Sequence, residues 1–184
     1  KDALLDGLEK TFGFKPPRHK GHNAIEAIEA IRDGRSKALI GLGGNLAVAM
    51  SDPEVTFKAV RGLDLAVHIA TKLNRSHLLI AKESIILPCL GRTEIDMQAG
   101  GPQAVTVEDS MSMVHASRGG LKPASEHLRS EPAIIAGIAM ATLRNSRVPW
   151  AELIADYSKI RDRIEAVFPA FKDFNAKVAK PGGF

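Results

Sequence analysis

The sequence of 184 residues contains a single cysteine, Cys89, and only 5% aromatic residues. One cysteine excludes an internal disulfide framework and every multi-cysteine zinc or iron–sulfur cage within this chain. Long hydrophobic runs are missing as well, since Ala133–Ala141 is about half the roughly 20 residues that a membrane-spanning helix needs. We therefore expect no membrane segment and no metal site built by this chain alone.

The excess of positive over negative charge is also small. The 25 Lys and Arg residues against 21 Asp and Glu give a net charge of +4, which an ordinary solvated surface explains. Nucleic-acid binding needs a clustered basic stripe with exposed aromatic residues, and the aromatic residues here fall mostly on predicted core faces, so we expect no nucleic-acid partner. The first residues, Lys1-Asp-Ala-Leu-Leu-Asp6, carry charges where a signal peptide has its apolar core, and we expect a cytoplasmic location.

The hydrophobic fraction of 45% is enough to bury a core, and its pattern indicates an α/β fold. Three short apolar runs predict strands at Lys37–Leu42, Leu63–Ala70 and Ser84–Pro88. A helix is predicted between the first two, with Asp52 as its N-cap and Pro53 in its first turn. Strand, helix and strand at this spacing predict parallel pairing. We expect a three-layer Rossmann-like domain with a mostly parallel sheet.

The domain organisation follows from these elements. Residues 1–22 are predicted to form an N-terminal helix and linker, 23–148 the α/β domain, and 149–184 a C-terminal helix and connector of the same domain. The stretch from Gly91 to Lys122 indicates a long excursion with one extended segment at Gln103–Asp109. The helical pattern at the first residues and the closing Pro181-Gly-Gly-Phe184 suggest an internal segment of a longer polypeptide.

Polar residues gather in the three loops that leave the predicted strands. Parallel strands bring such loops to one edge of the sheet, where ligands bind in α/β proteins. Amide and carboxylate groups suit a base or ribose, and a guanidinium suits a phosphate. We expect a nucleotide crevice formed by Asn45, Thr71, Lys72, Asn74, Arg92 and Glu94.

The first of these loops, Gly43-Gly44-Asn45, is open to two interpretations. Two glycines at a strand end permit close approach of a ligand to the backbone, or they form a tight turn. The segment Gly41-Leu-Gly-Gly-Asn-Leu46 lacks the third small residue of a G-x-G-x-x-G fingerprint, so an ordinary NAD site is disfavoured.

No catalytic constellation is visible in the sequence. His68 lies in an apolar strand and is interpreted as a satisfied core residue, and no other histidine has metal-ligand spacing. Cys89 has no neighbouring base and is interpreted as an inert packed thiol. Glu108 and Asp109 are neighbours on an extended segment, so they point to opposite faces. We expect this chain to contribute binding but no catalytic residue.

Several linked motifs occur along the chain in a specific order and spacing. They are Thr71-Lys-Leu-Asn-Arg-Ser-His77, Leu87-Pro-Cys-Leu-Gly-Arg-Thr-Glu-Ile-Asp96, Val105-Thr-Val-Glu-Asp-Ser-Met-Ser-Met-Val-His115, Leu128-Arg-Ser-Glu131, Asp173-Phe-Asn175 and Pro181-Gly-Gly-Phe184. Together they resemble one enzyme family, the formate-dehydrogenase-like branch of the molybdopterin oxidoreductases, and the resemblance covers essentially the whole chain. These enzymes are several times longer and hold molybdenum between two molybdopterin guanine dinucleotides.

The resemblance implies roles for individual residues. Asn45 matches the asparagine at a strand end that contacts the cofactor, although Leu46 stands where the family commonly has proline. Ala70 and Thr71 match a dipeptide that in relatives often ends in an aspartate that binds guanine. Arg92 or Glu94 falls near a cofactor-facing polar position.

Glu131 matches an acidic residue just before a helix, and two interpretations of it stay open. It faces the cofactor, or it is simply favourable with the helix dipole.

The resemblance also implies what the whole protein does. The chain is expected to clamp the guanosine part of one molybdopterin guanine dinucleotide, within a formate-dehydrogenase-like oxidoreductase that acts on a small-molecule substrate. The molybdenum ligand, the substrate residues and any iron–sulfur cysteines are expected in other domains of the same polypeptide. The alternative is a free-standing nucleotide-binding or regulatory module without redox activity.

Overall fold

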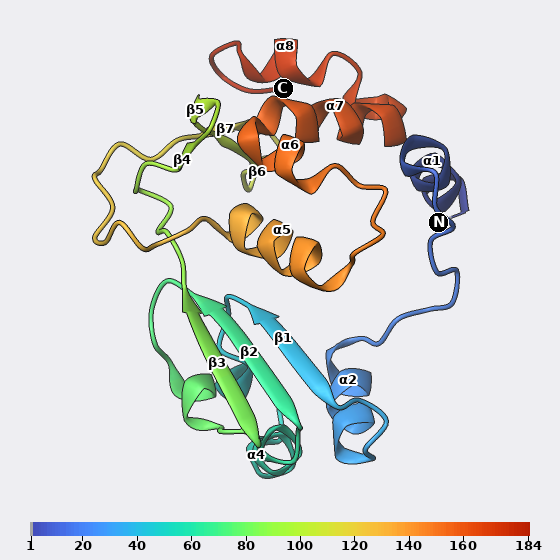
Figure 1. Ribbon diagram of the computed structural model, residues 1–184, viewed down its shortest axis with the longest axis vertical. Coiled ribbons are helices and arrows are strands. Elements are labelled where there is room, and N and C mark those ends of the chain that lie inside the picture. Colours follow the sequence, from blue (N-terminus) through green and yellow to red (C-terminus); the bar gives the residue numbers. More distant parts are fainter. Residues whose placement is uncertain (1) are drawn as a thin grey trace. The chain divides into compact units, whose positions relative to one another are not determined.

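Three parallel strands form the central sheet of the protein, for which a computed structural model describes residues 2–184 (Figure 1). Their order is β1-β2-β3, with β1 at Ala38–Leu42, β2 at Leu65–Ala70 and β3 at Glu83–Pro88. In the register, Gly41 lies opposite His68, and His68 lies opposite Ile86. The predicted α/β class and its parallel sheet are confirmed.

The sheet belongs to one of two compact units, which comprises His19–Cys89. Its helices are α2 (Ala24–Arg32), α3 (Leu46–Ala49) and α4 (Pro53–Arg61), with a 3-10 turn, η1, at Arg75–Leu78. The α2 helix begins with the predicted capping box, because the Asn23 side chain accepts from the Glu26 amide and the Glu26 carboxylate accepts from the Asn23 amide. The Asp52 side chain caps α4 by accepting from the Val55 amide.

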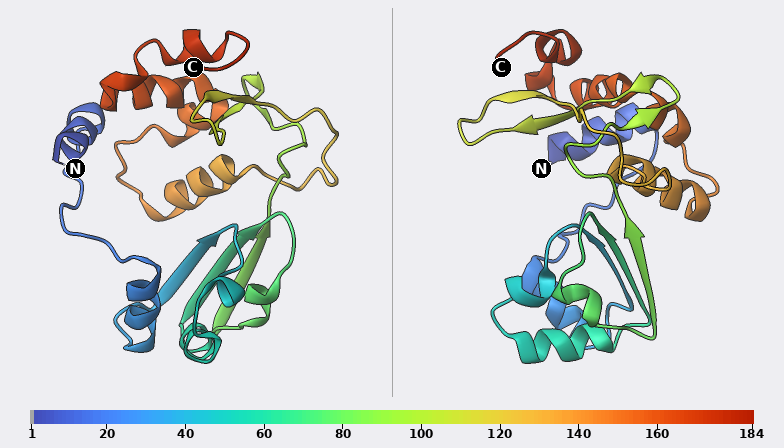
Figure 2. Two further views of the ribbon diagram at one scale, coloured as in Figure 1. Left: turned by 180° about the vertical axis from the view of Figure 1, so that it is seen from behind. Right: turned by 90° about the vertical axis from the view of Figure 1, so that its left-hand side faces the viewer.

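The core of this unit lies between the helices and one face of the sheet. Leu39 and Ala66 on that face pack with apolar residues of α2 and α4, among them Ile28 and Val60. The right-hand view of Figure 2 shows both helices on the same side of the strands. On the opposite face the side chains of Ile40, Leu42 and Ile85 are 53%, 52% and 45% exposed.

The second unit joins the residues up to Arg18 with Leu90–Phe184. Its helices are α1 (Asp2–Phe12), α5 (Glu131–Thr142), α6 (Trp150–Ala155), α7 (Tyr157–Val167) and α8 (Phe174–Val178), with a 3-10 turn, η2, at Pro169–Phe171. The boundary between the units falls after Cys89, directly after a strand. The predicted α/β domain of residues 23–148 includes residues of both units.

The expected excursion after Gly91 contains two small antiparallel sheets. One pairs β4 (Met97–Gln98) with β5 (Gly101–Pro102), and the other pairs β6 (Val105–Glu108) with β7 (Val114–Ser117). The predicted extended segment at residues 103–109 is therefore a hairpin strand. A single extended segment could be read from its alternation, but its pairing partner could not.

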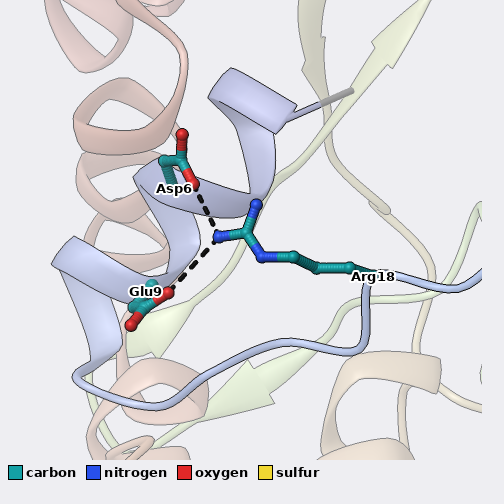
Figure 3. Close-up of polar contacts among 3 residues, drawn as sticks. All are labelled: Asp6, Glu9 and Arg18. Atoms are coloured by element: carbon teal, nitrogen blue, oxygen red, sulfur yellow. Dashed lines mark hydrogen bonds and ion pairs between the residues drawn. The ribbon is translucent and has the colours of Figure 1, made fainter.

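Hydrogen bonds and ion pairs hold the C-terminal residue beside β7 and join α1 to the linker that follows it. The backbone of Phe184 exchanges two hydrogen bonds with Val114, at 2.9 and 3.1 Å, and its ring contacts those of Phe171 and Phe174. Near the other end, the Arg18 guanidinium binds the carboxylates of Asp6 and Glu9 on α1, at 2.6 and 3.4 Å (Figure 3). No helix within residues 2–184 has the length and apolar character that crossing a membrane requires.

Candidate functional site

The loop after β1 has a backbone conformation that requires glycine. Gly43 and Gly44 have φ angles of 66° and 71°, in the left-handed region that side chains disfavour. The Gly43 amide donates to the Ile69 carbonyl at 2.8 Å, which holds the loop against β2. A Cβ atom on Gly44 would meet nothing within 4 Å. The conformation, rather than crowding, therefore demands glycine here, and the space beside the loop is open.

Asn74 fixes this loop from the segment that follows β2. Its Nδ2 donates to the Gly44 carbonyl at 2.7 Å, while its Oδ1 accepts from the Ser76 amide at 2.9 Å. Asn74 also begins the η1 turn, where its backbone amide donates to Nδ1 of His77 at 2.9 Å. One asparagine thus joins the loop ends of two neighbouring strands.

Ser76 makes the second connection between the two loops. Its buried hydroxyl donates to Oδ1 of Asn45 at 3.1 Å and accepts from the Ala47 amide at 3.0 Å. We call Asn45, Asn74, Ser76 and His77 the loop network. The structure brings the predicted residues Asn45 and Asn74 together, as the parallel-strand argument requires.

The sequence prediction missed Ser76 and His77 as site residues. Both lie in the segment Thr71–His77, whose density of polar groups is apparent in the sequence. An asparagine followed two and three residues later by serine and histidine is a signal for a side-chain-capped turn. Only the structure shows that the serine reaches across to Asn45.

The loop network leaves several hydrogen-bond donors unused. Within residues 2–184, the backbone amides of Gly44, Asn45 and Leu46 have no acceptor, and neither has Nδ2 of Asn45. Successive unpaired amides in a loop with left-handed glycines are typical of the backbone nests that bind anions, and we call the amides of Gly44, Asn45 and Leu46 the amide nest. The loop can therefore hold a negatively charged group such as a diphosphate.

A cavity of about 270 Å³ lies beneath the loop, lined by Leu39, Gly41, Gly43, Gly44, Asn45, Leu46, Ala49, His68 and Ser76. His68 is buried in β2 as the sequence predicts, and burial, followed by the nearby His77, lowers its pKa. The prediction that His68 is fully satisfied is wrong, because its Nε2 is buried without a hydrogen-bond partner in the described part of the chain. The His77 ring lies 5.0 Å away between centroids, and its Nε2 is likewise buried without a hydrogen-bond partner among the described residues.

Three other predicted residues lie at the end of β2 outside the loop network. Ala70 is the last residue of the strand, pairs with Pro88 and accepts a backbone bond from Cys89. Thr71 and Lys72 follow it with exposed side chains. They remain at the carboxyl edge of the sheet, but no hydrogen bond between described residues joins them to Asn45.

Arg92, Glu94 and Glu131 belong to the second unit and take no part in the loop network. Each oxygen of the Glu94 carboxylate accepts one backbone amide at 2.6 Å, from Gly91 and from Ala124, and these bonds lower its pKa. Glu94 therefore closes its own loop.

The other two residues of this group are exposed. Arg92 lies on the surface, between Gly91 and Glu94 in the loop that Glu94 closes. Glu131 is the first residue of α5, directly after its N-cap Ser130, where a negative charge is favourable with the helix dipole.

A second polar cluster, absent from the sequence prediction, lies in the same unit. The Tyr157 hydroxyl donates to the Asp96 carboxylate at 2.5 Å and lies 2.8 Å from the Ser130 hydroxyl, while Gln98 donates to Asp96 at 2.6 Å. Burial, together with the bond to Asp96, raises the pKa of Tyr157. Asp96, Gln98 and Ser130 line a cavity of about 370 Å³. These residues come from three separate segments, which no local pattern connects.

Metal-ligating side chains do not cluster in the part of the chain that the structure describes. Among residues 2–184, no three His, Cys, Asp or Glu side chains are placed to hold a metal ion. What the loop network presents is a set of neutral donors, which suits an anionic ligand rather than a cation.

These features define an α/β unit with a loop of unused amide donors at the carboxyl edge of a parallel sheet. No protein-family model matches the chain. Protein YdeP of Escherichia coli strain K12 is 58% identical over 181 residues, which are 98% of this chain and 24% of YdeP. A Mycobacterium tuberculosis protein named "Uncharacterized oxidoreductase Rv2900c" is 47% identical over 184 residues, 100% of this chain and 24% of that protein. The chain spans about a quarter of the length of these relatives.

Proposed function

We propose that this chain is the cofactor-binding part of a molybdopterin-dependent, formate-dehydrogenase-like oxidoreductase, and that it holds the guanosine diphosphate portion of one molybdopterin guanine dinucleotide. The observation that carries the proposal is the row of unused amides at Gly44, Asn45 and Leu46. The relatives that bear an oxidoreductase name support a redox role for the longer protein.

The loop after β1 suits the diphosphate of this cofactor. Open space beside Gly44 lets a ligand approach the backbone closely. The amide nest and Nδ2 of Asn45 supply donors for phosphate oxygens, and no carboxylate lines the cavity beneath them. A negatively charged diphosphate therefore meets donors and no opposing negative charge.

The end of β2 suits the nucleoside. Thr71 and Lys72 follow the strand as exposed side chains at the same edge of the sheet. A threonine hydroxyl offers one donor and lone pairs, so it bonds a base or ribose but cannot accept two N–H groups as a carboxylate does. We infer that Thr71 binds the guanine more weakly than an aspartate would.

This chain binds and orients the cofactor rather than reacting with substrate. The molybdenum of such a cofactor supplies two-electron redox chemistry when it is bound, and its ligand and the substrate residues are assigned to other parts of the polypeptide. The contribution of these residues is to fix one end of an extended anionic cofactor by hydrogen bonds.

The test is the composition of the intact protein that contains this chain. We expect molybdenum by elemental mass spectrometry, and guanosine monophosphate on acid hydrolysis, in a ratio of two nucleotides per metal. An active oxidoreductase that lacks both would overturn the proposal.

A free-standing nucleotide module is the competing function, and it rests on the same loop. All groups of the amide nest come from this chain, so they could bind a free nucleotide without further domains. Guanosine diphosphate that binds the 184-residue chain, together with an intact protein that contains no molybdenum, would favour the module.

A further inference from the structure

His77 is the residue on which the geometry of the loop network depends. Its Nδ1 accepts the backbone amide of Asn74 at 2.9 Å, and this bond closes the capping box of η1. Nδ1 also lies 3.2 Å from the Asn74 carbonyl oxygen, so the backbone of Asn74 offers it both a donor and an acceptor. These two contacts hold the His77 ring against the N-cap of the turn.

The turn that His77 holds carries both connections to the loop after β1. Asn74 donates to the Gly44 carbonyl, and Ser76 donates to Asn45 and accepts from Ala47. Without the Nδ1 bond, the Asn74 amide loses its partner and the turn loses one of its two capping contacts. A change at His77 then reaches the amide nest through the hydrogen bonds of Asn74 and Ser76.

The ring of His77 also lies against the wall of the cavity under the loop. It contacts the His68 ring, with 5.0 Å between centroids and 57° between planes, and His68 lines the cavity. Nε2 of His77 is buried without a partner in the described residues. Such a group is unfavourable for stability alone, because a buried polar atom without a hydrogen-bond partner costs desolvation free energy.

We propose that His77 is a positioning residue, which sets the conformation of the Gly44–Leu46 amide nest through Asn74 and Ser76 and thereby sets its affinity for an anionic ligand. This inference deepens the proposed function and rests on it only for the identity of the ligand. His77 does not touch the ligand in this account, because it acts through the two residues of its turn.

The test compares three forms of the intact protein: wild type, His77→Ala and His77→Gln. Hydrogen exchange followed by mass spectrometry reports protection of residues 43–49, and acid hydrolysis reports bound guanosine monophosphate. In His77→Ala we expect exchange of residues 43–49 to quicken about tenfold, as loss of a hydrogen bond worth about 1.4 kcal/mol predicts. Nucleotide content should fall several-fold in the same variant.

His77→Gln is the rescue variant, because a glutamine at the third position of a capping box accepts the N-cap amide. We expect it to restore most of the protection and the nucleotide content. His22→Ala is the matched control, since His22 is exposed in the same unit and makes no hydrogen bond among described residues.

Two results would overturn the inference. One is wild-type protection of residues 43–49 in His77→Ala, and the other is a His77→Gln variant as impaired as His77→Ala. Absence of guanine nucleotide from the wild type would count against the proposed function instead, while the exchange measurement would still decide the role of His77.

Discussion

Replacement of Ser76 by alanine tests the connection between the two loops most simply. The Ser76 side chain is 4% exposed, and its hydroxyl donates to Asn45 and accepts from the amide of Ala47, which is fully buried. Ser76→Ala removes one oxygen atom and leaves the Ala47 amide buried without an acceptor. Leaving such a donor unsatisfied costs about 1–3 kcal/mol, so we expect the unit of His19–Cys89 to lose about 2 kcal/mol of unfolding free energy.

The assay must follow the unfolding of the unit that contains Ser76, His19–Cys89. The single tryptophan, Trp150, belongs to the other unit, so its fluorescence would follow the wrong transition. Hydrogen exchange of peptides that span β2, measured across a urea series, reports the unit that contains Ser76. Ser51→Ala is the control, because Ser51 is exposed in the same unit and makes no hydrogen bond among described residues. A Ser76→Ala variant within about 0.5 kcal/mol of that control would refute the reasoning.

Three further predictions concern the second unit. Gly119→Ala should destabilise this unit by about 3 kcal/mol or more in urea unfolding, because a Cβ atom would lie 1.9 Å from the Glu94 carbonyl oxygen. Gly120→Ala is the control and should be nearly neutral, because a Cβ atom there meets nothing within 4 Å. Equal stabilities of the two variants would contradict this prediction. The pKa of Glu94 is lowered, so the stability that its carboxylate contributes is present above the unfolded value near 4.5 and is lost as pH falls through the lower folded pKa. Wild type should therefore be more stable than Glu94→Gln at pH 7 and lose that advantage in acid below pH 4.5; a pH-independent difference would contradict this assignment. Tyr157→Phe should cost about 1–3 kcal/mol in thermal unfolding, because the Asp96 carboxylate loses a donor, and an unchanged Tm would contradict that estimate.

The parallel sheet could be predicted from sequence because each strand carries its own signal. The predicted strands at 37–42, 63–70 and 84–88 match the observed Ala38–Leu42, Leu65–Ala70 and Glu83–Pro88 within two residues. Parallel pairing then follows from chain geometry alone. The contact of Asn74 with the loop that carries Asn45 is a direct consequence, since the two residues follow neighbouring strands.

What could not be predicted depends on contacts between distant segments. The reach of Ser76 to Asn45 spans 31 positions, and that of Tyr157 to Asp96 spans 61. Neither pair has a local pattern, because hydrogen-bond partners so far apart are selected by the fold. Glu94 shows the converse: its place in a polar motif suggests a ligand contact, yet its carboxylate is occupied by two backbone amides.

The guanosine monophosphate content of the Asn45→Asp variant tests the central claim most directly. This substitution keeps an oxygen for the Ser76 hydroxyl but places a negative charge beside the amides of Gly44 and Leu46. Asn145→Asp introduces the same charge at an exposed position and serves as control. If the loop binds the cofactor diphosphate, the intact Asn45→Asp protein should release at least about tenfold less guanosine monophosphate per polypeptide than wild type, while Asn145→Asp releases the wild-type amount. Wild-type nucleotide content in a folded Asn45→Asp protein would contradict the account.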